Sequence, residues 1–219
     1  AIFDHNKMAI QRGLQESYLN AHTVGSGKTF IMLTTAMEAR RLGLARKPMI
    51  VAQNATVGQI VSQFKQLYPW ATVIAPDKND FKPANRRRFM ARIATTDFDV
   101  VVVAQSHFNL IDDDPARVSS YIQAEINALE DAMRERGIDP ETTEKSRDPT
   151  VANFQRMRRS LIQRMEKVLD REVDPGLTFD MLGIDHLQVD EAHEYKKLQF
   201  QTTMDPIKGL DTSASQRAL

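Results

Sequence analysis

Cysteine is absent from the 219 residues of the sequence. The chain can therefore form neither disulfide bonds nor thiolate metal sites, and it has no cysteine nucleophile. A chain without cysteine is compatible with a reducing compartment, and we expect this protein to be cytoplasmic.

An excess of charge of one sign is also absent, because Lys plus Arg and Asp plus Glu both total 29. No overall field attracts the chain to nucleic acid, so any such contact must be local. Long apolar runs are missing as well, since none approaches the roughly 18 residues that cross a bilayer. The first residues lack the pattern of a secretory signal, and we expect no membrane partner.

Short apolar runs alternate with helical patterns along the chain, and 42% of its residues are hydrophobic. This alternation predicts an α/β fold in which helices flank a mostly parallel sheet. The clearest strand is the β-branched run 100–104, which has no polar alternation and suits a strand buried on both faces. The other expected strands are 18–21, 49–53, 72–75 and 187–189, and the expected helices are about 28–42, 56–68 and 83–94.

The stretch 115–170 departs from this rhythm and predicts a helical hairpin inserted into a single domain that spans 1–219. Asp114 and Asp148 each precede a proline, as helix N-caps do, and Gly137 ends the first helical pattern. Two apolar stripes recur at spacings of three and four, namely Val118, Ile122, Ile126, Leu129 and Met133, and Phe154, Met157, Leu161, Met165 and Val168.

The segment HTVGSGKT at 22–29 has the glycines, lysine and threonine of a phosphate-binding loop. Glycines let successive backbone N–H groups point at a phosphate, and the following helix adds its positive end. We expect ATP to contact Val24, Gly25, Ser26 and Gly27, with Lys28 on the phosphates and Thr29 on Mg²⁺. His22 stands where the full pattern has its first glycine.

The segment VDEAH at 189–193 ends a predicted strand with two adjacent carboxylates. Asp190 is the expected Mg²⁺ ligand, because the ion prefers oxygen donors and keeps part of its water shell. Glu191 is the expected general base that orients and deprotonates the attacking water. His193 is either a loop histidine or a link between the phosphate site and moving elements. Both motifs would lie at the carboxyl edge of one sheet, where such folds bind ligands.

Taken in order, the motifs resemble those of superfamily 2 helicases, and more narrowly those of Swi/Snf-type translocases. The segments 22–29 and 189–193 look like motifs I and II, 47–53 with 57–68 looks like motif Ia, and 99–106 looks like motif Ib. The phrases GSGKTF, RRLGLARKP, DEAHEYKKL and TSASQRA are similar to helicase-like regions of large phage and conjugative-element proteins, which are often fused to methyltransferases.

This resemblance implies the first RecA-like lobe of a DNA translocase, whose second lobe would lie outside this chain. It also implies non-specific contacts with the DNA backbone near Gln53, Gln105, Ser106, Lys196 and Lys197. The runs Arg86–Arg88 and 156–164 are more simply solvated helix faces.

Two other functions stay open on the sequence alone. The chain could be a P-loop ATPase with a regulatory or nucleotide-sensing role and no nucleic-acid partner, or a degenerate lobe that acts as a scaffold. Intact Lys28, Thr29, Asp190 and Glu191 argue against decay of the site. Gln11, seventeen residues before Lys28, is one candidate for reading adenine, but its surroundings equally suit an amphipathic helix.

Overall fold

The computed structural model describes residues 2–23, 25–77, 79–142, 148–170 and 178–195. The chain divides into two compact units, one formed by Ala1–Ile111 and Met181–Leu219 and the other by Asp112–Asp180. The predictions made above for Val24, Lys196, Lys197 and the segment 212–218 concern residues outside these described ranges.

A parallel sheet forms the centre of the first unit. Its strands are β1 (Pro48–Ala52), β2 (Val73–Ile74), β3 (Val100–Ala104) and β4 (His186–Val189), in the order β2-β3-β1-β4. In register, Ile50 of β1 lies opposite Val102 of β3 on one side and Gln188 of β4 on the other. This sheet, flanked by helices, confirms the predicted α/β fold of a RecA-like lobe.

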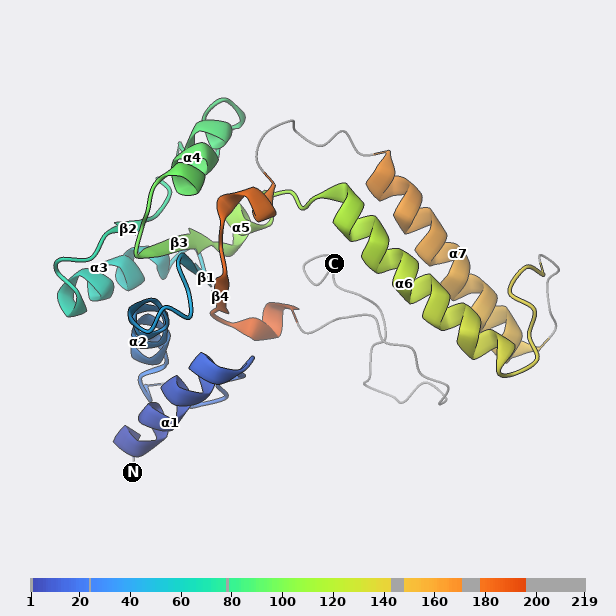
Figure 1. Ribbon diagram of the computed structural model, residues 1–219, viewed down its shortest axis with the longest axis horizontal. Helices are drawn as coiled ribbons and strands as arrows, with labels where there is room; N and C mark the ends of the chain where they lie inside the picture. Colours follow the sequence, from blue (N-terminus) through green and yellow to red (C-terminus); the bar gives the residue numbers. More distant parts are fainter. Residues whose placement is uncertain (1, 24, 78, 143–147, 171–177, 196–219) are drawn as a thin grey trace. The chain divides into compact units, whose positions relative to one another are not determined.

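Helices cover both faces of the sheet, with α2 and α3 on one side and α4 on the other (Figure 1). Their bounds are α2 (Lys28–Arg41), α3 (Val57–Leu67) and α4 (Pro83–Thr95), close to the predicted ranges. β1 and β3 are buried along their whole length, as their unbroken apolar sequences predict. One core cluster joins helices and strands through Leu33, Ala36, Ile50, Ala52, Ile60, Phe64, Ala71, Val100 and Val102.

Helix α1 (Ile2–Gln15) packs against α2 near the phosphate-binding segment. Gly13 allows this approach, because a Cβ atom there would lie 3.2 Å from Cγ2 of Thr35. Thr35 is itself buried in α2. The close packing ties the first helix of the chain to the helix that follows the phosphate-binding loop.

The prediction of a strand at residues 18–21 is wrong. The segment carries no strand hydrogen bonds, and the side chains of Tyr18 and Leu19 are 36% and 73% exposed. A cavity lined by this segment and by β4 separates the two backbones, so they do not form a ladder. Four residues of mixed polarity determine a strand only when a neighbouring strand lies within hydrogen-bonding distance.

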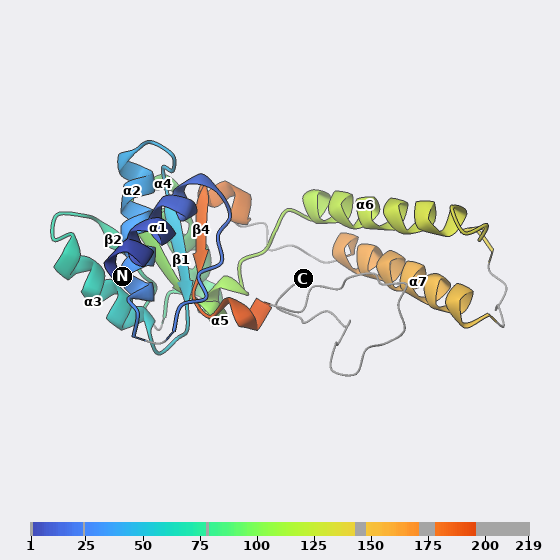
Figure 2. The ribbon, with the colours of Figure 1, turned by 90° about the horizontal axis from the view of Figure 1, so that it is seen from below.

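Two short 3₁₀ helices flank β4. The first, η1 (Phe179–Leu182), precedes the strand, and the second, η2 (Ala192–Tyr195), follows the acidic pair. The second unit contains α6 (Pro115–Arg134) and α7 (Pro149–Leu169), which Figures 1 and 2 show side by side and antiparallel.

The two helices of the second unit begin as their sequences predict. The carboxylate of Asp114 accepts a hydrogen bond from the backbone N–H of Ala116, and that of Asp148 accepts one from Thr150, with proline next in each case. The two predicted apolar stripes pack against each other, and their buried members are Ile122, Ile126, Leu129, Met133, Phe154 and Leu161.

Candidate nucleotide site

The phosphate-binding segment turns through two glycines with positive φ. Gly25 has φ 81° and Gly27 has φ 90°, a region that side chains with a Cβ rarely adopt. Gly27 is also the N-cap of α2, so the free N–H groups of the helix begin at Lys28. The local conformation therefore presents unpaired donors and the positive end of a helix in the way a phosphate requires.

The Lys28 ammonium lies over its own loop. Its Nζ donates hydrogen bonds to the carbonyl oxygens of His22 at 3.0 Å and Thr23 at 3.4 Å. The Ser26 hydroxyl also donates to the Thr23 carbonyl, at 2.7 Å. These local bonds satisfy the ammonium, and they can be exchanged for phosphate oxygens without opening any buried contact.

The acidic pair follows β4 at the carboxyl edge of the sheet. The Asp190 N–H donates to the carbonyl of Val51 at 2.8 Å, which extends the pairing of β4 with β1 beyond the strand. Glu191 comes next with φ 54°, the only positive φ at a described residue other than glycine. Its N–H donates to Oδ1 of Asp190 at 3.0 Å. The chain thus turns directly after β4, at the second of the two carboxylate residues.

Burial raises the pKa of Asp190, and the neighbouring Glu191 carboxylate raises it further. The Glu191 N–H and the Lys28 ammonium act in the opposite direction but do not cancel this effect. The ionised carboxylate therefore lacks enough positive charge around it. A divalent cation bound to Asp190 would supply that charge.

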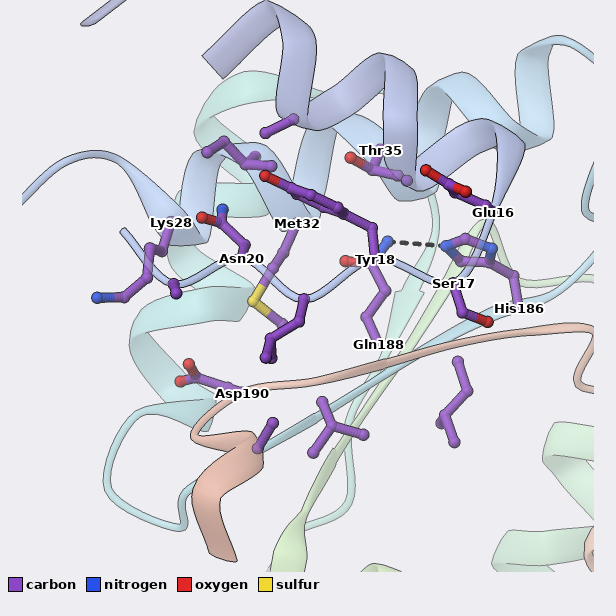
Figure 3. Close-up of a pocket in the computed structure, with 18 of the residues that line it drawn as sticks. Glu16, Ser17, Tyr18, Asn20, Lys28, Met32, Thr35, His186, Gln188 and Asp190 are labelled. Atoms are coloured by element: carbon purple, nitrogen blue, oxygen red, sulfur yellow. Dashed lines mark hydrogen bonds between the residues drawn. The ribbon is translucent and has the colours of Figure 1, made fainter. Parts of the chain in front are cut away.

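One cavity of about 850 Å³ joins the two motifs. Its wall includes Lys28 of the first motif together with Asp190, Glu191 and His193 of the second. Figure 3 shows Lys28 and Asp190 at one end of this cavity, with Glu16 and His186 at the other. The fold thus brings the predicted phosphate-binding lysine and both acidic residues to one space at the sheet edge.

A comparison with protein families agrees with this arrangement. The family model described as "Probable helicase domain" matches residues 13–219. The chain belongs to this helicase-domain family. No curated protein matches the chain significantly. Helicase domains in general depend on a nucleotide and Mg²⁺ and act on nucleic acid, so the family agrees with the coarse expectation for this cavity.

The oxygen donors of the helicase domain suit Mg²⁺. Asp190 offers a carboxylate, and Thr29, the second residue of α2, offers a hydroxyl. Among the residues that the structure describes, no three His, Cys, Asp or Glu side chains gather as a metal cage. Mg²⁺ is commonly held by one or two protein oxygens together with phosphate oxygens and water. Asp190 lines the cavity, whereas Thr29 is not one of its lining residues.

His193 lies beside the predicted general base of the helicase domain. Its Nδ1 is 2.9 Å from Oε2 of Glu191, and both side chains are partly exposed. This direct contact with the predicted general base favours the second alternative, in which His193 is a link to the phosphate site.

Three of the predicted DNA-contact residues of the helicase domain, Gln53, Gln105 and Ser106, lie where β1 and β3 end. Gln53 and Ser106 are exposed, and the Ser106 hydroxyl donates to Oδ1 of Asn54 at 2.9 Å. Gln105 begins α5 (Gln105–Phe108) but is only 8% exposed, and its Nε2 donates to the carbonyl of Asp190 at 3.1 Å. Sequence reasoning missed this contact and the part played by Asn54, because no local pattern marks a bond across 85 positions.

Other candidates lie away from the cavity. Gln11 is exposed on α1 and is not part of the cavity wall, whereas Gln15, one turn further along the helix, is. Arg87 and Arg88 are exposed on α4, as the interpretation of a solvated helix face predicts. Within the described part of the chain, no helix is long and apolar enough to span a membrane.

Proposed function

We propose that this chain is the ATP-binding lobe of an ATP-dependent DNA translocase, which hydrolyses ATP with Mg²⁺ to move along DNA. The observation that carries the proposal is that Lys28, Asp190 and Glu191 line one cavity at the carboxyl edge of a parallel sheet. A lysine at a helix N-terminus facing two adjacent carboxylates is the combination of charges that Mg·ATP requires.

Each side chain has a distinct role in this proposal. The backbone N–H groups after Gly25 and Gly27 and the Lys28 ammonium would bind the phosphates, and Thr29 with Asp190 would hold Mg²⁺. Mg²⁺ would neutralise charge that develops on the phosphate oxygens. Glu191 would orient and deprotonate the attacking water. The chain would supply this half of the nucleotide cleft, and a second RecA-like lobe would supply arginine side chains to the other half.

The order of the four motifs supports a superfamily 2 lobe of the Swi/Snf type, and the phrases shared with phage and conjugative-element proteins support a mobile-element origin. DNA would be contacted through its backbone, at the exposed ends of β1 and β3. Gln53, Ser106, Lys196 and Lys197 stay predicted contacts.

Nucleotide binding by Lys28→Ala tests the site. The matched control is Lys65→Ala, because Nζ of Lys65 also donates to a main-chain carbonyl, that of Ala71 at 2.9 Å, but in α3 and outside the cavity wall. We expect the first variant to lose binding of a fluorescent ATP analogue and the second to keep it. Equal affinities of the two variants for the analogue would contradict a nucleotide site at Lys28.

DNA-stimulated ATP hydrolysis by the full-length protein tests the translocase activity. We expect DNA to raise the turnover of the wild type, and Glu191→Gln to keep nucleotide binding while hydrolysis falls about a hundredfold or more. One observation favours a P-loop ATPase without a nucleic-acid partner: residues 53–56 and 105–109 contain no Lys or Arg. That alternative predicts hydrolysis that does not respond to DNA.

A further inference from the structure

Gln105 is a buried amide at the edge of the nucleotide site. It follows the last residue of β3, and it is one of few buried polar residues in the described part of the chain. A buried amide is costly unless it is hydrogen-bonded. Its Nε2 meets that need by donating to the carbonyl oxygen of Asp190 at 3.1 Å. The side-chain amide is therefore bonded to the backbone of the acidic pair.

The peptide group between Asp190 and Glu191 is constrained on both sides. The Asp190 carbonyl accepts from Gln105, and the Glu191 N–H donates to Oδ1 of Asp190. In the preceding peptide group, the Asp190 N–H donates to the carbonyl of Val51. Glu191 then leaves this peptide at φ 54°, a left-handed conformation that persists in a residue with a Cβ only when surrounding contacts hold it.

We propose that Gln105 is a positioning residue that fixes the Asp190–Glu191 peptide and thereby the direction of the Glu191 carboxylate. The φ rotation of Glu191 starts from this peptide plane, so holding its carbonyl restrains the direction in which the side chain leaves the backbone. This inference rests on the proposed function, in which Glu191 is the general base. It predicts that Gln105 controls hydrolysis and leaves nucleotide affinity nearly unchanged.

The same residue connects the acidic pair to an exposed edge of the lobe. Gln105 begins α5, and the next residue, Ser106, is exposed and bonded to Asn54 after β1. Further along α5, the ring of His107 stacks on Phe81 with centroids 4.4 Å apart. Gln105 therefore lies between the proposed general base and the edge where DNA contact is proposed, so the same amide would link the two.

Gln105→Met in the full-length protein tests this role, because methionine keeps the length and removes the donor. The matched control is Gln155→Met in α7, since Gln155 is also buried and donates from Nε2 to a backbone carbonyl, that of Thr142 at 3.2 Å. We expect Gln105→Met to lower kcat on the order of tenfold to a hundredfold. The Kd for Mg·ATP should stay unchanged, and stimulation by DNA should fall toward none. Gln155→Met should keep wild-type kcat and stimulation.

The mobility of the acidic turn gives a readout beside the rates. Amide hydrogen exchange of residues 189–193 should be faster in Gln105→Met than in Gln155→Met.

The outcomes separate the two proposals. A wild type that binds Mg·ATP and responds to DNA, with Gln105→Met equal to it in kcat and stimulation, overturns the role of Gln105 and leaves the translocase proposal standing. Equal amide hydrogen exchange of residues 189–193 in Gln105→Met and Gln155→Met overturns it as well. A wild type that neither binds Mg·ATP nor responds to DNA overturns the proposed function, and this inference falls with it.

Discussion

Nδ1 of His193 lies 2.9 Å from Oε2 of Glu191, two residues earlier in the chain. The Glu191 carboxylate, proposed to act on water, is therefore oriented by this contact as well as by the backbone turn after Asp190. His193→Ala should lower kcat by up to about fivefold, because an exposed pair is worth about 1 kcal/mol at most.

The free energy of unfolding should change little in this variant, since the side chains of His193 and Glu191 are 54% and 41% exposed. Steady-state hydrolysis and chemical denaturation measure the two quantities. A rate unchanged by His193→Ala would show that the contact does not orient the base.

Asp190→Asn should stabilise the fold at neutral pH while abolishing Mg²⁺-dependent nucleotide binding. Burial, with the Glu191 charge, raises the pKa of Asp190, so the folded state disfavours the ionised form. Above the raised pKa the wild type carries this cost, and as pH falls through that pKa the carboxyl is protonated and the cost disappears. The advantage of the variant should therefore shrink on acidification, as thermal unfolding at a series of pH values can measure.

Asp99→Asn is the control with the opposite sign. Burial alone would raise the pKa of Asp99, but hydrogen bonds from Thr72 and the ion pair with Arg40 outweigh it and lower that pKa. Its ionised form is thus favoured in the fold, and the variant should be less stable than the wild type at neutral pH. Destabilisation by both Asn variants at neutral pH would contradict a raised pKa of Asp190 in the folded state.

Lys47→Met should lower the free energy of unfolding by about 1–3 kcal/mol, because it leaves buried carbonyls without a donor. Nζ of Lys47 donates to the carbonyls of Ile93 at 2.7 Å, Ala94 at 3.1 Å and Leu182 at 3.3 Å. These bonds join the start of β1 to the end of α4 and to the segment before β4. Lys65→Met, which removes a bond to a single carbonyl, should cost less in the same denaturation experiment.

Gly27→Ala should destabilise the lobe by about 1–2 kcal/mol through its positive φ alone. A Cβ atom there would also lie 3.1 Å from Nδ2 of Asn6 in α1, which should add to the cost. Gly25→Ala shares the positive φ but meets open space, so the difference between the two variants isolates the contact with Asn6. Gly58→Ala, within α3, should instead stabilise by about 0.5–1 kcal/mol. Thermal unfolding of the three variants gives the comparison.

Leu129→Ala should lower the stability of residues 112–180 by about 2–5 kcal/mol, because Leu129 is fully buried between α6 and α7. Nucleotide affinity should not change, since none of the cavity wall belongs to that unit. Hydrogen exchange of α6 and α7 together with nucleotide binding checks both parts. Weaker nucleotide binding in this variant would show that the two units are coupled.

The amino-acid sequence by itself determined the elements whose pattern is local. The β-branched run of β3 could only be a buried strand, Asp114 and Asp148 began two helices ahead of prolines, and the spacing of apolar residues placed α6 and α7. The motifs around Lys28 and Asp190 likewise carry their chemistry in consecutive residues. These features needed no partner from elsewhere in the chain.

Only the tertiary structure decided what depends on a partner far along the chain. Residues 18–21 have mixed polarity and no neighbouring strand, so they form no strand. The sequence predicts Gln105 as a DNA contact. In the fold, the residue after β4 lies close enough for the Gln105 amide to donate to the carbonyl of Asp190. The left-handed turn at Glu191 and the three carbonyls around Lys47 have the same origin. Burial, and the hydrogen bonds that burial demands, arise only when distant segments pack together.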